Sequence, residues 1–154
     1  MDANMDSKEQ AALREIAATC LCTEARKTAR AVTRLYARHF AGTGLEPAQF
    51  TILVAIRLTE PVTLLHLAGH LGLERTTFTR NLGVLQRNGL VTVKRGTDAR
   101  KRLLSLTQAG RNKLRKALPR WHQAQQSAKT LLGEKNFNKL SEALSLSAGF
   151  NNSN

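Results

Sequence analysis

The sequence is short of cysteine, aromatic residues and acids, and each shortage excludes a class of protein. Cys20 and Cys22 are the only cysteines among 154 residues, too few for a disulfide framework. Aromatic residues make up 5%, so stacking on aromatic rings is not expected to be a main binding mode. No apolar run approaches the ~18 residues that a membrane span needs, and the polar N-terminus does not resemble a signal peptide. We therefore expect a cytoplasmic protein with no membrane partner.

The shortage of acids leaves a large positive charge. There are 11 acids against 24 lysines and arginines, which gives a net charge of +13 at pH 7. The stretch from Arg75 to Arg120 carries thirteen of these cations, with Asp98 as its single acid. A surplus of this kind attracts polyanions such as nucleic acid, an anionic membrane or an acidic protein. Hydrophobic residues make up 42%, which is enough for the core of one domain.

Motifs of enzyme chemistry are missing. The sequence has no Gly-rich phosphate loop, no paired catalytic carboxylates in an apolar setting and no nucleophile motif. His66 and His70 have the i, i+4 spacing of a zinc pair, but no third ligand is near them in sequence. We therefore predict that the protein is not an enzyme and has no cofactor and no metal site.

Residues 8–40 follow one uninterrupted helical pattern without proline or glycine. A helix of ~30 residues is about 45 Å long, more than one small domain can cover. The pattern therefore predicts packing against a second copy of the chain. In a single domain over 1–154, we expect dimerisation helices at about 8–41 and 120–150, with a winged helix-turn-helix at about 45–118.

The helix-turn-helix prediction comes from two short helices joined by a glycine turn. Residues 59–63 are read as a turn, and Thr63 as the N-cap of a helix that ends at Gly72. The second helix, Glu74–Asn88, has an inward apolar face and an outward polar face. Its inward residues are Phe78, Leu82 and Leu85. In a helix-turn-helix, the second helix carries its polar face into the DNA major groove.

A strand–turn–strand pattern follows this helix pair. Leu90–Val93 and Arg102–Leu106 are predicted strands on either side of a turn at 96–99. Thr107 caps a further helix, which Pro119 is expected to kink or end. The predicted fold class is all-α with a small β-hairpin wing, and the cations of the hairpin are placed to meet phosphates and a minor groove.

Three segments carry a resemblance to a known family. They are "GLEPAQFTIL", "LAGHLGLERTTFTRNLGVLQRNGLV" and "DARKRLLSLTQAG". With them the chain resembles the MarR family of bacterial transcriptional regulators. The last segment matches the family's D-x-R-x-K/R wing signature, followed by L-T-x-x-G. The resemblance implies a homodimer with interlocking N- and C-terminal helices, in which each winged helix binds half of a pseudo-palindromic operator in double-stranded DNA.

The same resemblance implies which residues contact DNA. The recognition-helix face would consist of Arg75, Thr76, Thr77, Thr79, Arg80 and Asn81. The wing would consist of Lys94, Arg95, Asp98, Arg100, Lys101 and Arg102. By motif match, Arg100 would enter the minor groove and Asp98 would orient it.

Two regulatory sites are considered. Members of the family bind small aromatic acids between the dimer helices and the winged domain, which makes Tyr36 and His39 ligand candidates, although core packing explains them equally well. Some members sense peroxides through a cysteine near the start of the first helix, where Cys20 and Cys22 stand. Residues two apart on a helix point about 200° from each other, so these two cannot pair while that turn stays helical. One of them would pair or react across the dimer, or would be a small apolar residue of the core.

The predicted function is a sequence-specific DNA-binding transcriptional regulator, a dimeric repressor released by a small ligand or by thiol oxidation. The alternative is a non-specific architectural nucleic-acid-binding protein. Such a protein would have the same salt-dependent attraction to phosphates but no preferred site.

Overall fold

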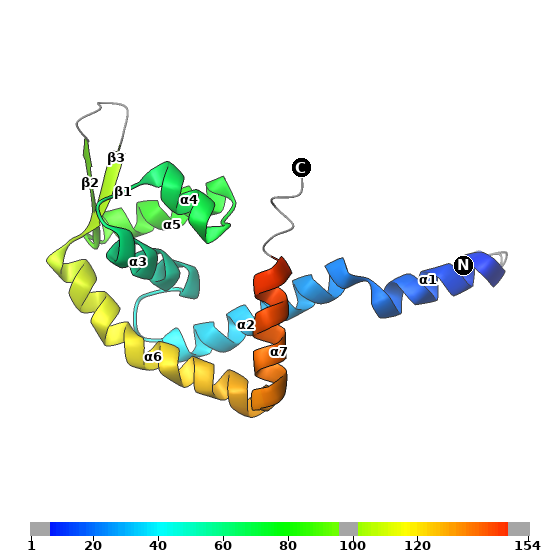
Figure 1. The fold of residues 1–154 in the computed structure, drawn as a ribbon. Coiled ribbons are helices and arrows are strands. Elements are labelled where there is room, and N and C mark those ends of the chain that lie inside the picture. Colours follow the sequence, from blue (N-terminus) through cyan, green and yellow to red (C-terminus); the bar gives the residue numbers. More distant parts are fainter. Residues whose placement is uncertain (1–6, 96–101, 148–154) are drawn as a thin grey trace. The chain divides into compact units, whose positions relative to one another are not determined.

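The computed structural model describes residues 7–95 and 102–147 (Figure 1). The chain divides into two compact units, residues 1–35 and residues 36–154. The second unit contains the elements predicted to bind DNA.

The first unit contains α1 (Ser7–Thr19) and most of α2 (Leu21–Phe40). The prediction of one uninterrupted helix is wrong, because the structure interrupts it at Cys20. The Thr19 hydroxyl donates to the carbonyl oxygen of Glu15 at 2.8 Å, a back-bond that bends helices. No side chain of α1 is buried.

The second unit begins its DNA-binding part with α3 (Pro47–Thr59). Proline suits the first helical position, where its missing N–H needs no partner. The N–H of Glu46 donates to Oε1 of Gln49 at 3.0 Å, so the glutamine closes the start of the helix. Many side chains of this helix are buried in the core. They are Gln49, Phe50, Ile52, Leu53, Ala55 and Ile56.

The predicted helix-turn-helix is confirmed by α4 (Leu64–Leu71) and α5 (Arg75–Arg87). The Thr63 side chain accepts from the N–H of His66 at 3.3 Å and caps α4. Gly72 ends α4 in the left-handed region, with φ of 58°. The inward face of α5 is buried as predicted, through Phe78, Leu82 and Leu85.

The wing is part of a three-stranded antiparallel sheet with the order β1-β3-β2. β2 (Val91–Arg95) and β3 (Arg102–Leu106) form the predicted hairpin. β1 (Val62–Thr63) pairs with β3 and lies in the segment that the sequence analysis read only as a turn. A strand of two residues is too short to show a period, and its partner is about 40 residues away, so local patterns miss it.

Two helices complete the unit, α6 (Gln108–Leu132) and α7 (Glu134–Ser147). Pro119 was expected to kink or end the helix, and it does not end it, because α6 continues through it to Leu132 (Figure 1). Ala117 and Ala124, both buried, stabilise the helix on either side of the proline by packing. The helix ends at Gly133, which has φ of 74°.

The end of α5 is fastened to the start of α6. The Thr107 hydroxyl donates to the carbonyl oxygen of Gly89 at 2.7 Å and accepts from the N–H of Gly110 at 2.9 Å. The N–H of Thr107 donates to the carbonyl oxygen of Leu90 at 3.0 Å. The predicted N-cap residue Thr107 therefore also connects the end of α5 to the start of α6.

Candidate nucleic-acid interface

The outward face of α5 presents the predicted recognition residues. Arg75, Thr76, Thr79 and Arg80 are exposed. Thr77 and Asn81 are half-buried, and the Asn81 amide donates to the carbonyl oxygen of Thr77 at 2.9 Å. The two arginines and two exposed threonines are therefore the side chains of this face that are best placed to reach a ligand.

An acid that the sequence analysis did not select stands at the start of this helix. Glu74 accepts hydrogen bonds from the hydroxyls of Thr76 and Thr77. The Thr76 bond, followed by weaker contributions from Thr77, lowers the pKa of the Glu74 carboxyl. A charged carboxylate at a helix N-terminus also interacts favourably with the helix dipole. Glu74 thus fixes the hydroxyl groups of both threonines at the start of the helix.

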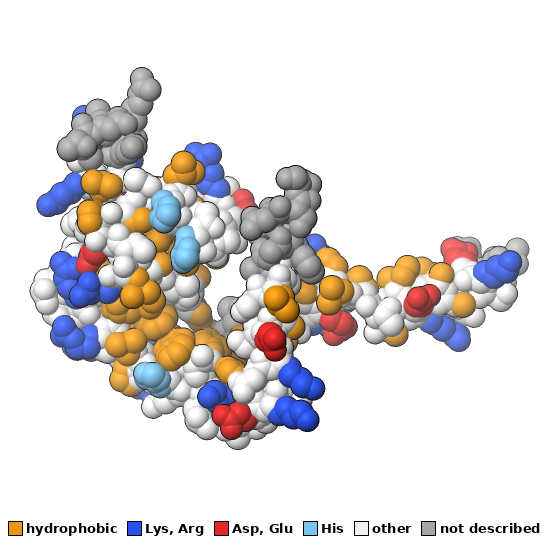
Figure 2. All heavy atoms as spheres, viewed as in Figure 1, with side chains coloured by type: hydrophobic (Ala, Val, Ile, Leu, Met, Phe, Trp, Pro, Cys, Tyr) orange, Lys and Arg blue, Asp and Glu red, His pale blue; other side chains and the backbone are white. Residues whose placement is uncertain are grey.

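The described part of the wing carries cations directly opposite each other. Lys94, Arg95 and Arg102 are exposed, and Arg95 is paired with Arg102 across the strands. Like charges in directly opposed positions destabilise a sheet, so the pair has no structural advantage of its own. Figure 2 shows lysine and arginine side chains at the end of the hairpin where the described strands stop. The predicted wing-tip residues Asp98, Arg100 and Lys101 lie outside the described residues.

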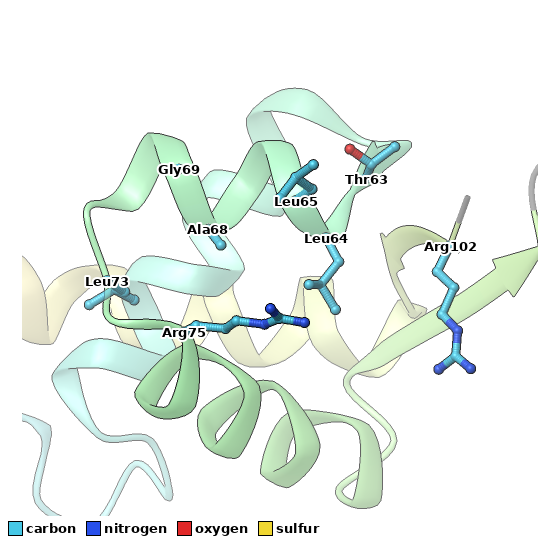
Figure 3. A pocket seen from close by; sticks show the side chains of 8 residues that line it. All are labelled: Thr63, Leu64, Leu65, Ala68, Gly69, Leu73, Arg75 and Arg102. Carbon is cyan, nitrogen blue, oxygen red and sulfur yellow. The ribbon is translucent and has the colours of Figure 1, made fainter. Parts of the chain in front are cut away.

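A pocket is lined by residues of both the recognition helix and the wing (Figure 3). It has a volume of about 610 Å³ and lies between α4, the start of α5 and β3. Arg75 and Arg102 both line it, so the fold brings together cations that are 27 positions apart in sequence. Leu64 and Leu65 of α4 supply apolar walls, and Leu65 is 84% exposed.

Glu60 connects the wing to the rest of the domain, and sequence reasoning missed it. One carboxylate oxygen accepts from the N–H of Leu106 in β3 at 2.7 Å. The other accepts from Arg111 of α6 at 2.6 Å and from Arg57 of α3 at 3.4 Å. The Glu60 side chain is only 14% exposed. The carboxylate therefore links α3, β3 and α6, through partners too distant in sequence to form a local motif.

The two predicted ligand residues lie near the end of α2. The Tyr36 hydroxyl donates to Oε1 of Gln125 in α6, and burial raises the pKa of the tyrosine. His39 is half-buried. These contacts are compatible with core packing, and a ligand role for either residue stays a prediction.

Both cysteines are free thiols. Cys20 is half-buried at the interruption between α1 and α2, and Cys22 is exposed. A hydrogen bond from the Thr23 side chain lowers the pKa of the Cys20 thiol, and Arg26 adds a smaller effect of the same sign. The N–H of Glu24 donates to the carbonyl oxygen of Cys20 at 3.1 Å, so the turn that carries both cysteines keeps a helical bond, and the expectation that the two thiols point apart stays a prediction.

The described residues offer neither a metal site nor a membrane span. No group of three His, Cys, Asp or Glu residues that could hold a metal ion occurs within residues 7–95 and 102–147. Over the same residues, none of the helices combines the length and the apolar character needed to cross a bilayer.

Comparisons with known proteins agree with this geometry. A model of the MarR family matches residues 43–102, which include α3, α4, α5 and the wing. In Bacillus subtilis strain 168, the HTH-type transcriptional regulator YwoH is 33% identical over 70 residues, 46% of this chain. The match spans about half of that relative's length, 51%.

Solved structures match over more of the chain. The transcriptional regulator MosR of M. tuberculosis, in complex with DNA, is 37% identical, with 83% of this chain and 98% of that chain covered and a TM-score of 0.69. The transcriptional repressor CouR, bound to a 23-mer DNA duplex, is 26% identical, with 87% and 95% covered and a TM-score of 0.78.

The helix pair, the hairpin and the third strand define a winged helix-turn-helix protein. The family match and the similarity to MosR over nearly its whole length identify the family. The chain belongs to the MarR family.

Proposed function

We propose that the protein is a cytoplasmic, sequence-specific transcriptional regulator. It would bind double-stranded DNA as a homodimer and repress transcription. The observation that carries the proposal is the convergence of cations from two elements. Arg75 of α5 and Arg102 of β3 line one pocket, and Arg102 stands opposite Arg95. A polyanion would relieve the repulsion between these guanidinium groups.

In the proposed complex, α5 lies in the major groove. Arg75 and Arg80 would donate to guanine O6 and N7, and the methyl groups of Thr76 and Thr79 would contact thymine. Lys94, Arg95 and Arg102 would contact phosphates, and Arg100 at the wing tip would enter the minor groove, oriented by Asp98. This assignment is supported by the exposure of the described side chains and by the DNA-bound states of MosR and CouR.

A homodimer is supported by apolar side chains outside the core. Leu131 at the end of α6 and Leu146 of α7 are each 72% exposed, and Leu21 of α2 is 71% exposed. A second copy would cover them, as apolar helix faces usually pack against one another. Residues 8–41 and 120–150 would then supply the dimerisation helices.

Repression would be relieved by a change in the spacing of the two recognition helices. Helices that bind successive major grooves must stay about 34 Å apart. A small ligand near Tyr36 and His39, or oxidation at Cys20 or Cys22, would disturb this spacing. A ligand-responsive mechanism is supported by the solved relatives, because CouR has also been seen with p-coumaroyl-CoA and BpsR of Bordetella bronchiseptica is described as regulated by 6-hydroxynicotinic acid.

The proposal is tested by selecting random duplex DNA with the reduced protein at moderate salt and sequencing the bound pool. We expect a two-fold symmetric site with half-sites one helical turn apart. On that site, Arg80→Ala should weaken binding by about 1–3 kcal/mol and relax specificity at one position. Arg115→Ala, at an exposed position of α6, removes the same charge and should leave specificity unchanged. Equal binding to all sequences would instead identify an architectural protein.

Thiol sensing gives a separate expectation. Because the pKa of Cys20 is lowered, its thiolate is populated at lower pH, and Cys20 should react with iodoacetamide faster than Cys22 near neutral pH. Peptide mass spectrometry after brief labelling measures the two rates. Peroxide would convert the Cys20 thiolate to a sulfenic acid, which condenses with a second thiol to a disulfide and releases water. A Cys20→Ser variant that still loses DNA affinity after peroxide treatment would remove Cys20 from the mechanism.

A further inference from the structure

A second cationic pocket lies on the winged-helix unit, away from the pocket in Figure 3. It has a volume of about 350 Å³ and is formed by the turn at residues 41–43 and by the middle of α6. Figure 1 shows this turn, which follows the end of α2, beside α6. The α6 side contributes Lys113, Lys116 and Arg120. The two pockets share no lining residue.

The three cations share one face of α6. Their steps of three and four residues place them in neighbouring turns on the same side, where like charges repel. Within residues 7–95 and 102–147, no acid lies in ion-pairing range of any of them. Arg120 donates to the neutral amide oxygen of Gln123, at 3.3 Å. The face therefore concentrates positive charge without compensation from the described part of the chain.

Lys113 lines this pocket and extends toward Gly44, the residue after the turn. It is half-buried, and its Nζ lies 2.9 Å from the position that a Cβ on Gly44 would occupy. The glycine, with φ of 69°, thus leaves room for the ammonium group beside the backbone of the turn. Among the described residues no acid pairs with Lys113, so its charge adds to those of Lys116 and Arg120.

We propose that this pocket binds the phosphate group of a small molecule, as a free ion or as an ester. Two ammonium groups and a guanidinium group supply charge-assisted donors to a multivalent anion. The volume accommodates a phosphate with a small substituent, and the walls, formed by Ala41, Thr43 and Ala117, leave little apolar surface for a large aromatic group. The site is independent of the DNA contacts proposed for α5 and the wing.

The test is calorimetric titration of the DNA-free protein with inorganic phosphate and with glycerol 3-phosphate, at constant ionic strength. We expect saturable binding of one anion per chain to the wild type. Lys116→Gln/Arg120→Gln should weaken it by about tenfold or more, because two charged donors are lost. Tighter binding of inorganic phosphate would identify the free ion as the ligand, and tighter binding of glycerol 3-phosphate would identify an ester.

Matched variants separate this pocket from general charge attraction. Lys135→Gln/Lys139→Gln removes the same charge from exposed positions of α7 and should bind phosphate like the wild type. Arg75→Ala/Arg80→Ala should lose DNA affinity but keep phosphate binding. Lys116 and Arg120 are exposed, so their replacement should not affect folding, which circular dichroism would verify. Absence of saturable binding, or an equal loss in the α7 variant, would overturn the proposal.

Discussion

Replacing Gly110 with alanine is expected to lower the free energy of unfolding by about 3 kcal/mol, through overpacking against a backbone that cannot yield easily. A Cβ at this position would stand 2.1 Å from the carbonyl oxygen of Leu90 and 3.0 Å from its carbonyl carbon. Leu90 is held by its own bonds, since its N–H donates to Leu85 and its carbonyl oxygen accepts from Thr107. The clash must therefore move α6 away from the end of α5 or distort the start of β2.

Urea denaturation of the wild type and the variant measures this loss, and DNA binding at fixed salt measures its effect on the interface. The matched control is Gly69→Ala in the middle of α4, where an added Cβ meets nothing within 4 Å. That change should stabilise the protein by about 1 kcal/mol, the usual difference between glycine and alanine inside a helix. If the two variants shift the unfolding midpoint in the same direction, the close approach at Gly110 is not a constraint in solution.

The second large effect is expected at Glu60. Glu60→Gln should lower the free energy of unfolding by about 2–3 kcal/mol, because Arg111 loses its partner in a poorly exposed site. The amide can still accept one bond from the N–H of Leu106, but its NH₂ group would then face a guanidinium donor. The wing loses its connection to α3 and α6, so DNA affinity should fall even under conditions where the variant is fully folded.

Urea denaturation again measures stability, and titration of the selected DNA site measures affinity. Glu24→Gln provides the comparison, since the Glu24–Lys27 pair spans 2.9 Å but its side chains are 53% and 58% exposed. Loss of that exposed pair should cost about 0.5 kcal/mol or less. Double replacement of Glu60 and Arg111 should be less than additive if the two act as a pair. If the losses of unfolding free energy in the two single variants add up strictly in the double variant, Glu60 and Arg111 do not act as a pair.

Elements with local signals were predictable from the sequence. Thr63 and Gly72 mark both ends of α4 by their chemistry, and the apolar period of the next helix places Phe78 in the core, where it is fully buried. The hairpin follows from alternation, and its register then fixes which cations face each other. The family's L-T-x-x-G pattern was recognisable as a motif, but its physical basis, Thr107 bonding across the reversal and Gly110 lying against Leu90, requires the fold.

Features that depend on distant partners were not predictable. β1 exists because β3 lies beside it, and neither the composition nor the period of two residues shows this. The interruption at Cys20 has no local sequence signal such as glycine or proline. At Pro119 the helix does not end, because packing of α6 outweighs the loss of one backbone donor. The role of Glu60 could not be predicted for the same reason, since its hydrogen-bond partners Leu106 and Arg111 are 46 and 51 residues away in sequence.

The junction between α5 and α6 has a mechanical consequence. Thr107 forms hydrogen bonds with Gly89 and Leu90, directly after α5. Glu60 accepts hydrogen bonds from β3 and from Arg111 in the first turns of α6. The start of the long helix α6 is therefore bonded to the elements proposed to bind DNA. A displacement of the far end of α6 would be transmitted to α5 and the hairpin together. An effector would therefore not have to bind near the DNA. A shift of the C-terminal end of α6 would be enough to change the orientation of α5 and the hairpin.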